Sequence, residues 1–144
     1  MASKMKKPKK NVKEREVATS KEISKRIKNT ANAMIKEIKA NTDPTFTTMQ
    51  RGKSNVVWDE KKGYLSLGDK QITRNFLNVA HARKFMQTNM IMAKTNDYLL
   101  HNKTASIREI YYELKHTIKG SKENTFEGQD ESDPTIVDLE HSVN

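Results

Sequence analysis

Residues 103–118 read KTASIREIYYELKHTI, and the spacing of their apolar side chains decides how this part of the chain folds. Ser106 and Glu109 have the spacing of a capping box, which predicts a helix from Ser106 to about Ile118 that Gly120 ends. At about 100° per residue, five apolar side chains fall within about 100° of arc and predict one buried stripe. They are Ile107, Ile110, Tyr111, Leu114 and Ile118.

A second face of the same predicted helix, about 110° round, carries Arg108, Tyr112, Lys115 and Lys119. We therefore expect Tyr111 to pack and Tyr112 to face outward among cations. Arg108 and Tyr112 are four residues apart, so their side chains are neighbours on the helix surface. An arginine holds a phosphate through two parallel hydrogen bonds, which would bring that phosphate beside the tyrosine hydroxyl.

Tyrosine is a poor nucleophile at its usual pKa of about 10 and needs nearby positive charge, a base or a metal. Arg108 and Lys115 supply such charge. The same pattern is also typical of a solvated helix face, or of a tyrosine that stacks on DNA. Periodicity alone does not separate these alternatives.

Four further elements are predicted around this helix. Thr19 and Glu22 form another capping box and open a helix that ends near Asn41, before Asp43 and Pro44. Its apolar face is predicted to contain Ile23, Ile27, Ala31, Met34, Ile35 and Ile38. A polar stretch over 45–54 precedes two β-like runs, 55–58 and 64–67, which the turn 59–63 joins into a hairpin.

A long helical pattern runs from about Thr73 to Leu100, with its methionines as core filler. Asp133 has the features of an N-cap with Pro134 at the first helical position, and Ile136, Val137 and Leu139 are predicted to face the core. The expected fold class is therefore α+β and mainly helical, a helix-turn-helix of the winged-helix type with a small β-hairpin.

Composition excludes several classes of protein. The 144 residues suffice for one domain, and 34% hydrophobic with 31% charged residues indicates that part of the chain is disordered or awaits a partner. The chain contains no cysteine, and its four histidines form no close pair, so we predict neither disulfides nor a metal site. It contains no stretch of about 20 apolar residues, so we expect an intracellular soluble protein without membrane contact.

The net charge of +9 is unevenly distributed. Residues 1–40 carry thirteen Lys or Arg against four Asp or Glu, whereas residues 123–144 carry seven acids and no Lys or Arg. Basic segments attract polyanions, nucleic acid first and acidic membranes second, although lysine-rich tails also simply keep proteins soluble. We expect residues 1–16 to be a disordered basic tail, and the acidic segment to meet a basic surface elsewhere or a metal-handling region of a longer chain.

Five separated motifs resemble, in order, those of the topoisomerase VI A-subunit family, which includes the related meiotic double-strand-break protein. The motifs are residues 54–59 (SNVVWD), 63–68 (GYLSLG), 74–77 (RNFL), 103–116 (KTASIREIYYELKH) and 123–133 (ENTFEGQDESD). The resemblance covers residues 17–144. It implies a winged-helix DNA-cleavage domain of the catabolite-activator type over those residues.

The resemblance also implies a role for each matching residue. Tyr112 would attack a DNA phosphodiester, form a 5′-phosphotyrosyl link and free a 3′-hydroxyl, while Arg108 holds the phosphate. We expect further DNA contacts from a set of basic side chains: Lys103, Arg74, Lys115 and Lys119. Gln129, Glu131 and Ser132 match a segment near the site and are predicted to be supporting residues.

Members of that family work as A2B2 assemblies on double-stranded DNA, in which the B subunit is the GHKL ATPase that binds ATP. Mg²⁺ is held by a Toprim domain that follows in the A subunit. This sequence stops before such a domain, so we expect DNA binding but no cleavage without a Toprim-containing remainder. The expected location is cytoplasmic and nucleoid-associated in an archaeon, or nuclear in a eukaryote.

Two alternatives stay open. One is a winged-helix DNA-binding protein without cleavage chemistry, whose DNA binding would be the same with tyrosine or phenylalanine at position 112. The other is a meiotic break-making relative, although Lys115 with His116 and the segment 131–133 look more like the archaeal topoisomerase form. No Asn or Gln lies on the outward face between Arg108 and Lys119, so we expect weak sequence preference.

Overall fold

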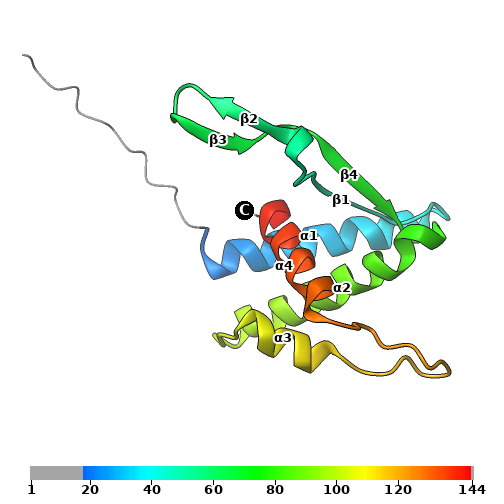
Figure 1. Cartoon of the computed structure of the whole chain (residues 1–144). Coiled ribbons are helices and arrows are strands. Elements are labelled where there is room, and N and C mark those ends of the chain that lie inside the picture. Colours follow the sequence, from blue (N-terminus) through cyan, green and yellow to red (C-terminus); the bar gives the residue numbers. More distant parts are fainter. Residues whose placement is uncertain (1–17, 144) are drawn as a thin grey trace, which may run out of the picture.

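The computed structural model describes residues 18–143, and the predicted basic tail (1–16) lies outside them. Within this range the chain is α+β, which confirms the predicted class, and Figure 1 shows a helical body from which a β-ribbon extends. The elements are α1 (Ser20–Lys39), β1 (Thr45–Met49), η1 (Lys53–Asn55), β2 (Val56–Asp59), β3 (Tyr64–Leu67), β4 (Gln71–Asn75), α2 (Val79–Leu100), α3 (Ile107–Leu114) and α4 (Gln129–Val143).

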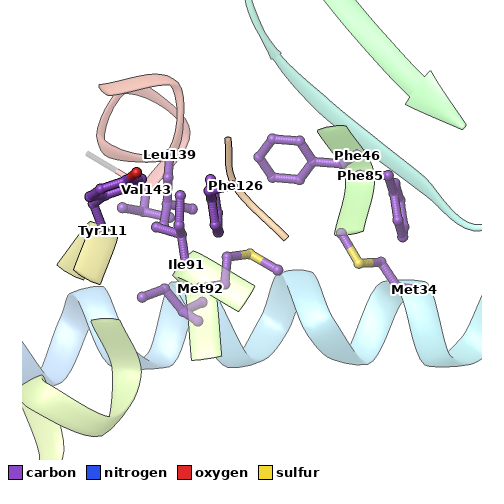
Figure 2. Packing of buried hydrophobic residues seen from close by; sticks show 10 residues of the cluster. Met34, Phe46, Phe85, Ile91, Met92, Tyr111, Phe126, Leu139 and Val143 are labelled. Atoms are coloured by element: carbon purple, nitrogen blue, oxygen red, sulfur yellow. The ribbon is translucent and has the colours of Figure 1, made fainter. Parts of the chain in front are cut away.

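The core forms where α1, α3 and α4 pack around α2. Figure 2 shows Tyr111, Leu139 and Val143 at one end of the core and Phe46, Phe85 and Met34 at the other, with Phe126 between them. Phe126 comes from the loop before α4 and is fully buried, so this loop is part of the core. Met34 and Met92 are buried here too.

Helix α1 begins as predicted, since Thr19 and Glu22 form a reciprocal capping box. Ile27 and Met34 are buried on its inner face. Two residues predicted on the apolar face are not covered, because Ile35 and Ile38 are 47% and 57% exposed. The apolar stripe of α1 is therefore wider than the surface that α2 covers.

The four strands form one long antiparallel ribbon that is interrupted in the middle. β2 pairs with β3, from Val56 opposite Leu67 to Asp59 opposite Tyr64, which confirms the predicted hairpin. β1 pairs with β4, from Thr45 opposite Asn75 to Met49 opposite Gln71. The sequence showed only a polar stretch over 45–54 and did not predict β1 there. The predicted helix start near Thr73 was wrong, because β4 occupies 71–75 and α2 begins only after the cap Asn78.

Asn55 joins the two halves of the ribbon. Its buried side-chain amide donates to the carbonyls of Gln50 (2.7 Å), Gly68 (3.1 Å) and Lys70 (3.2 Å), and its Oδ1 accepts from the Lys70 amide (3.0 Å). A Cβ on Gly68 would lie 2.7 Å from Asn55 Oδ1, so this position requires glycine. The base of the hairpin is thus held by this side chain together with the backbone hydrogen bonds from Gly68 to Asn55 and from Gln50 to Lys70.

Two helix boundaries differ from the prediction. α3 ends at Leu114, because Lys115 leaves helical geometry (ψ 112°) and Thr117 then pairs with Asn124, so Ile118 and Lys119 are not on the helix. α4 begins at Gln129, four residues before the predicted N-cap Asp133, and Pro134 lies inside the helix. The earlier start of α4 follows from tertiary contacts of Glu131, which an Asp-Pro pair in the sequence does not reveal.

The acidic C-terminal segment contacts a basic surface within the chain. This was one of the two expectations for that segment. Asp138 of α4 accepts from Arg51 Nε (2.7 Å) and from Arg74 Nη2 (3.2 Å) of the ribbon. The backbone carbonyl of Asp138 also accepts from Thr48 Oγ1 (3.0 Å). These bonds fix the inner half of the ribbon to the helical body.

We expect Asp138→Ala to lower the free energy of unfolding by about 3 kcal/mol, because it leaves the largely buried Arg74 guanidinium without its carboxylate. Denaturant titration measures this change. The matched control is Asp69→Ala at an exposed position of the ribbon, where a change within about 0.5 kcal/mol is expected. Equal stability of the two variants would contradict the structural role of the ion pair.

Candidate nucleic-acid interface around Tyr112

Helix α3 is positioned by its cap and by α2. Ser106 Oγ accepts from the Glu109 amide (3.1 Å) and Glu109 Oε2 accepts from the Ser106 amide (3.1 Å), so the predicted capping box is confirmed. Glu113 on α3 accepts from Tyr98 Oη of α2 (2.7 Å) and forms an ion pair with Lys94. α3 is therefore held at its start by the cap and along one side by α2.

The two adjacent tyrosines have different surroundings, as the helical spacing predicts. Tyr111 is only 6% exposed and belongs to the core, whereas Tyr112 is 59% exposed. Their rings are 5.1 Å apart, centroid to centroid, at 57°. The Tyr112 ring thus rests against a fixed neighbour while its hydroxyl reaches solvent.

Arg108 lies directly beside the Tyr112 hydroxyl. Its Nη2 donates a 3.3 Å hydrogen bond to Tyr112 Oη, and the guanidinium carbon lies 5.6 Å from the centre of the Tyr112 ring. This hydrogen bond and the charge of Arg108, with a smaller contribution from Lys115, hold the pKa of Tyr112 below its usual value. A guanidinium has five N–H donors, so donors remain for an anionic ligand beside the hydroxyl.

Lys115 contacts Tyr111 instead of Tyr112. Its Nζ donates to Tyr111 Oη (2.8 Å) and to the carbonyl of Glu127 (3.1 Å), and Tyr111 Oη donates to the same carbonyl (3.2 Å). The three groups join the end of α3 to the loop before α4. Lys115 therefore holds the structure beneath the candidate site, and its charge reaches Tyr112 only through space.

Glu131 holds the other side of this loop. Its carboxylate accepts two hydrogen bonds from Arg83 (3.2 and 3.1 Å), one from Gln87 Nε2 (2.9 Å) and one from the Glu127 amide (3.0 Å). Burial alone would raise the pKa of Glu131, but these donors hold it below its usual range. The predicted supporting residue thus lies in a network that fixes the segment on which Tyr111 and Lys115 rest.

Sequence reasoning missed Arg83 and Gln87. They lie four residues apart on α2, and Gln87 is buried, where its Nε2 also donates to the carbonyl of Thr125 (2.9 Å). A glutamine that is buried on an amphipathic helix needs a polar partner. The polar residue at position 87 was therefore the only feature of the sequence that could have indicated this network. The partner itself lies 44 residues along the chain, so the sequence did not identify it.

The remaining predicted site residues are spread over several elements. Lys103 is exposed in the loop between α2 and α3, and Lys119 is exposed in the turn that follows α3. Gln129 is the first residue of α4 and is partly buried. Arg74 lies on β4 with its guanidinium on Asp138. The structure therefore places Arg108 on the Tyr112 hydroxyl and Lys115 on the neighbouring Tyr111, and DNA contacts by any of these residues remain predictions.

Across residues 18–143, no group of three or more His, Asp or Glu side chains is arranged to hold a metal ion. Acidic side chains near the site are engaged within the protein, Glu131 by Arg83 and Glu127 by Asn124. In the same range, no helix is both long and apolar enough to cross a membrane.

Comparison with known proteins shows which protein family this chain is related to. The model of the Type IIB DNA topoisomerase family matches residues 83–144, which contain α3, α4 and nearly all of α2. The A subunit of type 2 DNA topoisomerase 6 from Pyrococcus abyssi is 47% identical over 121 residues, 84% of this chain and 32% of that protein. The chain is homologous to part of the type IIB topoisomerase A subunits.

Two other A subunits of type 2 DNA topoisomerase 6 agree. That of Pyrococcus horikoshii is 46% identical over 121 residues, covering 84% of this chain and 32% of the relative. That of Saccharolobus shibatae is 36% identical over 116 residues, covering 74% of this chain and 30% of the relative. The chain thus spans about a third of the length of the A subunits it matches.

The different surroundings of the two tyrosines predict opposite mutational effects in this A-subunit homologue. Tyr111→Phe removes the hydroxyl that accepts from Lys115 and donates to the Glu127 carbonyl, and should lower the free energy of unfolding by about 1 kcal/mol. Tyr112→Phe removes an exposed hydroxyl and should change it by less than about 0.5 kcal/mol. Denaturant titration of the pair tests this, and a larger loss for Tyr112→Phe would contradict the assignment of the buried tyrosine.

Removing the Arg108 guanidinium should raise the pKa of Tyr112. Arg108→Ala deletes both the hydrogen bond and the charge that favour the phenolate, so less Tyr112 ionises at a given alkaline pH. NMR titration of the chain with ¹³C-labelled tyrosine rings, assigned with Tyr112→Phe, measures the shift. Lys103→Ala is the control, and Tyr98, whose pKa is raised by its hydrogen bond to Glu113, should titrate separately. An unmoved Tyr112 titration in Arg108→Ala would refute the proposed coupling.

Proposed function

We propose that this chain is the N-terminal, DNA-cleaving part of a type IIB DNA topoisomerase A subunit, with Tyr112 as the nucleophile. One observation carries the proposal: an exposed tyrosine hydroxyl has a guanidinium 3.3 Å away on the preceding helical turn. The homology to A subunits supports it, because the matched family region contains both residues. DNA is the proposed substrate.

The proposed reaction needs two functions from this pair. Arg108 binds the non-bridging oxygens of a DNA phosphate, which places the phosphorus beside Tyr112. Tyr112 Oη loses its proton and attacks the phosphorus, the bond to the 3′-oxygen breaks, and that oxygen leaves as a 3′-hydroxyl after taking up a proton. The product is a 5′-phosphotyrosyl link. Attack by the 3′-hydroxyl reverses the step, so resealing needs no separate energy source.

Arg108 serves this reaction twice. Its charge favours the phenolate in the free protein, and the same charge stabilises the extra negative charge on phosphorus during attack. Lys115, Tyr111 and Glu131 act as positioning residues, since they hold the end of α3 and its supporting loop. The pair therefore needs a rigid base, which the loop 123–128 supplies.

The fold is proposed to be a winged-helix domain. Three helices, α2, α3 and α4, pack against one another, and the β-ribbon extends beside them, which are the elements of that architecture. Lys103 and Lys119 are exposed and suited to phosphate contacts. The proposed contact surface leaves out Arg74, which Asp138 holds.

The whole-protein activity is proposed on the same basis. Two A subunits would each cut one strand of duplex DNA, with a GHKL-type B subunit that binds ATP and drives strand passage. Mg²⁺ would be held by a Toprim-containing part of the A subunit. The described residues form no metal site, and no step assigned to this chain passes through a metal.

Covalent trapping tests the nucleophile and the polarity of the link together. The chain is mixed with Mg²⁺, a Toprim-containing A-subunit remainder, a B subunit, ATP and a duplex labelled at either its 3′ or its 5′ ends, then denatured. We expect 3′-labelled strands to become linked to protein and 5′-labelled strands to be released free. Tyr112→Phe should abolish the link, whereas the control Tyr64→Phe, another exposed tyrosine, should retain it.

Two results would overturn this function. Linkage of the 5′-labelled strand would reverse the proposed polarity. Equal DNA binding by wild type and Tyr112→Phe with no linked product from either would indicate a winged-helix protein that binds DNA without cleaving it.

A further inference from the structure

A groove of about 560 Å³ lies between the N-terminal half of α1 and the C-terminal end of α2, on elements that the candidate site does not use. Besides Ser20 and Ser24, its polar lining is formed by three lysines and three asparagines: Lys21, Lys25, Lys28, Asn29, Asn32 and Asn102. Asn102 directly precedes Lys103, so the groove ends at the loop that leads into α3. The loop 101–106 therefore connects this groove to the element that carries Tyr112.

The three lysines form one row. Positions 21, 25 and 28 are four and three residues apart and share a helix face. The row is about 10 Å long, given a rise of about 1.5 Å per residue. A DNA duplex rises about 3.4 Å per nucleotide along its axis, so the row spans about three base-pair steps of that axis.

Nothing within the described range neutralises this row. No Asp or Glu lines the groove, and none of the three lysines forms an ion pair between residues 18 and 143. Glu22, the nearest acid in sequence, binds the Thr19 amide and hydroxyl in the capping box. Like charges four residues apart disfavour a helix, so the row costs stability that an anionic ligand would recover.

The other groups of the groove also suit phosphate. Asparagine side chains donate N–H groups to phosphate oxygens without reading bases. The groove includes the first residue of α1, where the helix dipole is positive. The opposing negative end of α2 is satisfied by the amides of His101, Asn102 and Lys103, which donate to carbonyls of the last helical turn.

We propose that this groove binds the phosphate backbone of duplex DNA, as the flank of a duplex whose cleaved phosphate lies at Tyr112. This inference rests on the proposed function, because it takes duplex DNA as the ligand. Binding is independent of sequence and adds affinity without taking part in the chemistry. The DNA surface then runs from α3 over the α2–α3 loop onto α1.

The test compares two triple variants of the full chain that lose the same charge. Lys21→Gln/Lys25→Gln/Lys28→Gln empties the groove of cations, whereas Lys36→Gln/Lys39→Gln/Lys53→Gln removes three exposed lysines outside it. Fluorescence anisotropy on a duplex of about 30 base pairs, about three helical turns, gives the affinity as a function of KCl concentration. Thermal melts by circular dichroism check that both variants fold.

The groove variant should lose about 3 from the slope of log affinity against log salt, close to 0.9 for each lost phosphate contact, and bind at least about tenfold more weakly at low salt. The control should lose less than about 1 from the slope. On a duplex of about 10 base pairs, too short to cover both regions, the difference between the variants should largely vanish. Equal slopes for the two variants on the long duplex would overturn the proposal.

The variant Arg108→Ala distinguishes failure of the groove proposal from failure of the proposed function. If wild type binds the long duplex and Arg108→Ala weakens it while the groove variant does not, the groove proposal alone fails. If wild-type protein binds no duplex even at low salt, the proposed function fails, and the groove proposal fails with it.

Discussion

The Glu127 carbonyl and the Glu131 carboxylate fasten one short loop on two sides, and the site depends on that loop. The carbonyl accepts from Tyr111 and Lys115 of α3, while the carboxylate accepts from Arg83 and Gln87 of α2 and from the Glu127 amide. Phe126, fully buried, pins the same loop to the core. Gln87 and Tyr111 are buried members of this network and need their polar partners, so a change at one position loosens the base of α3.

This rigidity explains how two adjacent tyrosines serve different purposes. The Tyr111 hydroxyl is used inside the protein, so its ring is a fixed support 5.1 Å from that of Tyr112. The Tyr112 hydroxyl accepts from Arg108 and remains open to solvent. Lys115 has the charge to assist Tyr112 but is held by Tyr111 and Glu127, so Arg108 dominates the electrostatics of the exposed phenol and lowers its pKa most.

The basic side chains of this protein differ in whether an acidic side chain lies close enough to neutralise their charge. Carboxylates of α4 neutralise Arg51, Arg74 and Arg83, which fixes the ribbon and α2 to the C-terminal helix. Within residues 18–143, the three lysines of the α1 groove have no such counter-charge. Basic side chains therefore fall into a structural set, paired with acids, and a set open to an anionic partner.

Sequence alone determined the features that depend on neighbours along the chain. Capping boxes at Thr19 and Ser106, the outer hairpin, and the outward direction of Tyr112 beside Arg108 all follow from contacts within four residues or from a tight turn. Tertiary structure decided what depends on distant partners. β1 is a strand because β4 pairs with it from a distant part of the chain, α4 starts early because Glu131 reaches Arg83, and Lys115 points to Tyr111 because the Glu127 carbonyl is there. Local periodicity cannot encode such partners, because each one is supplied by a separate part of the chain.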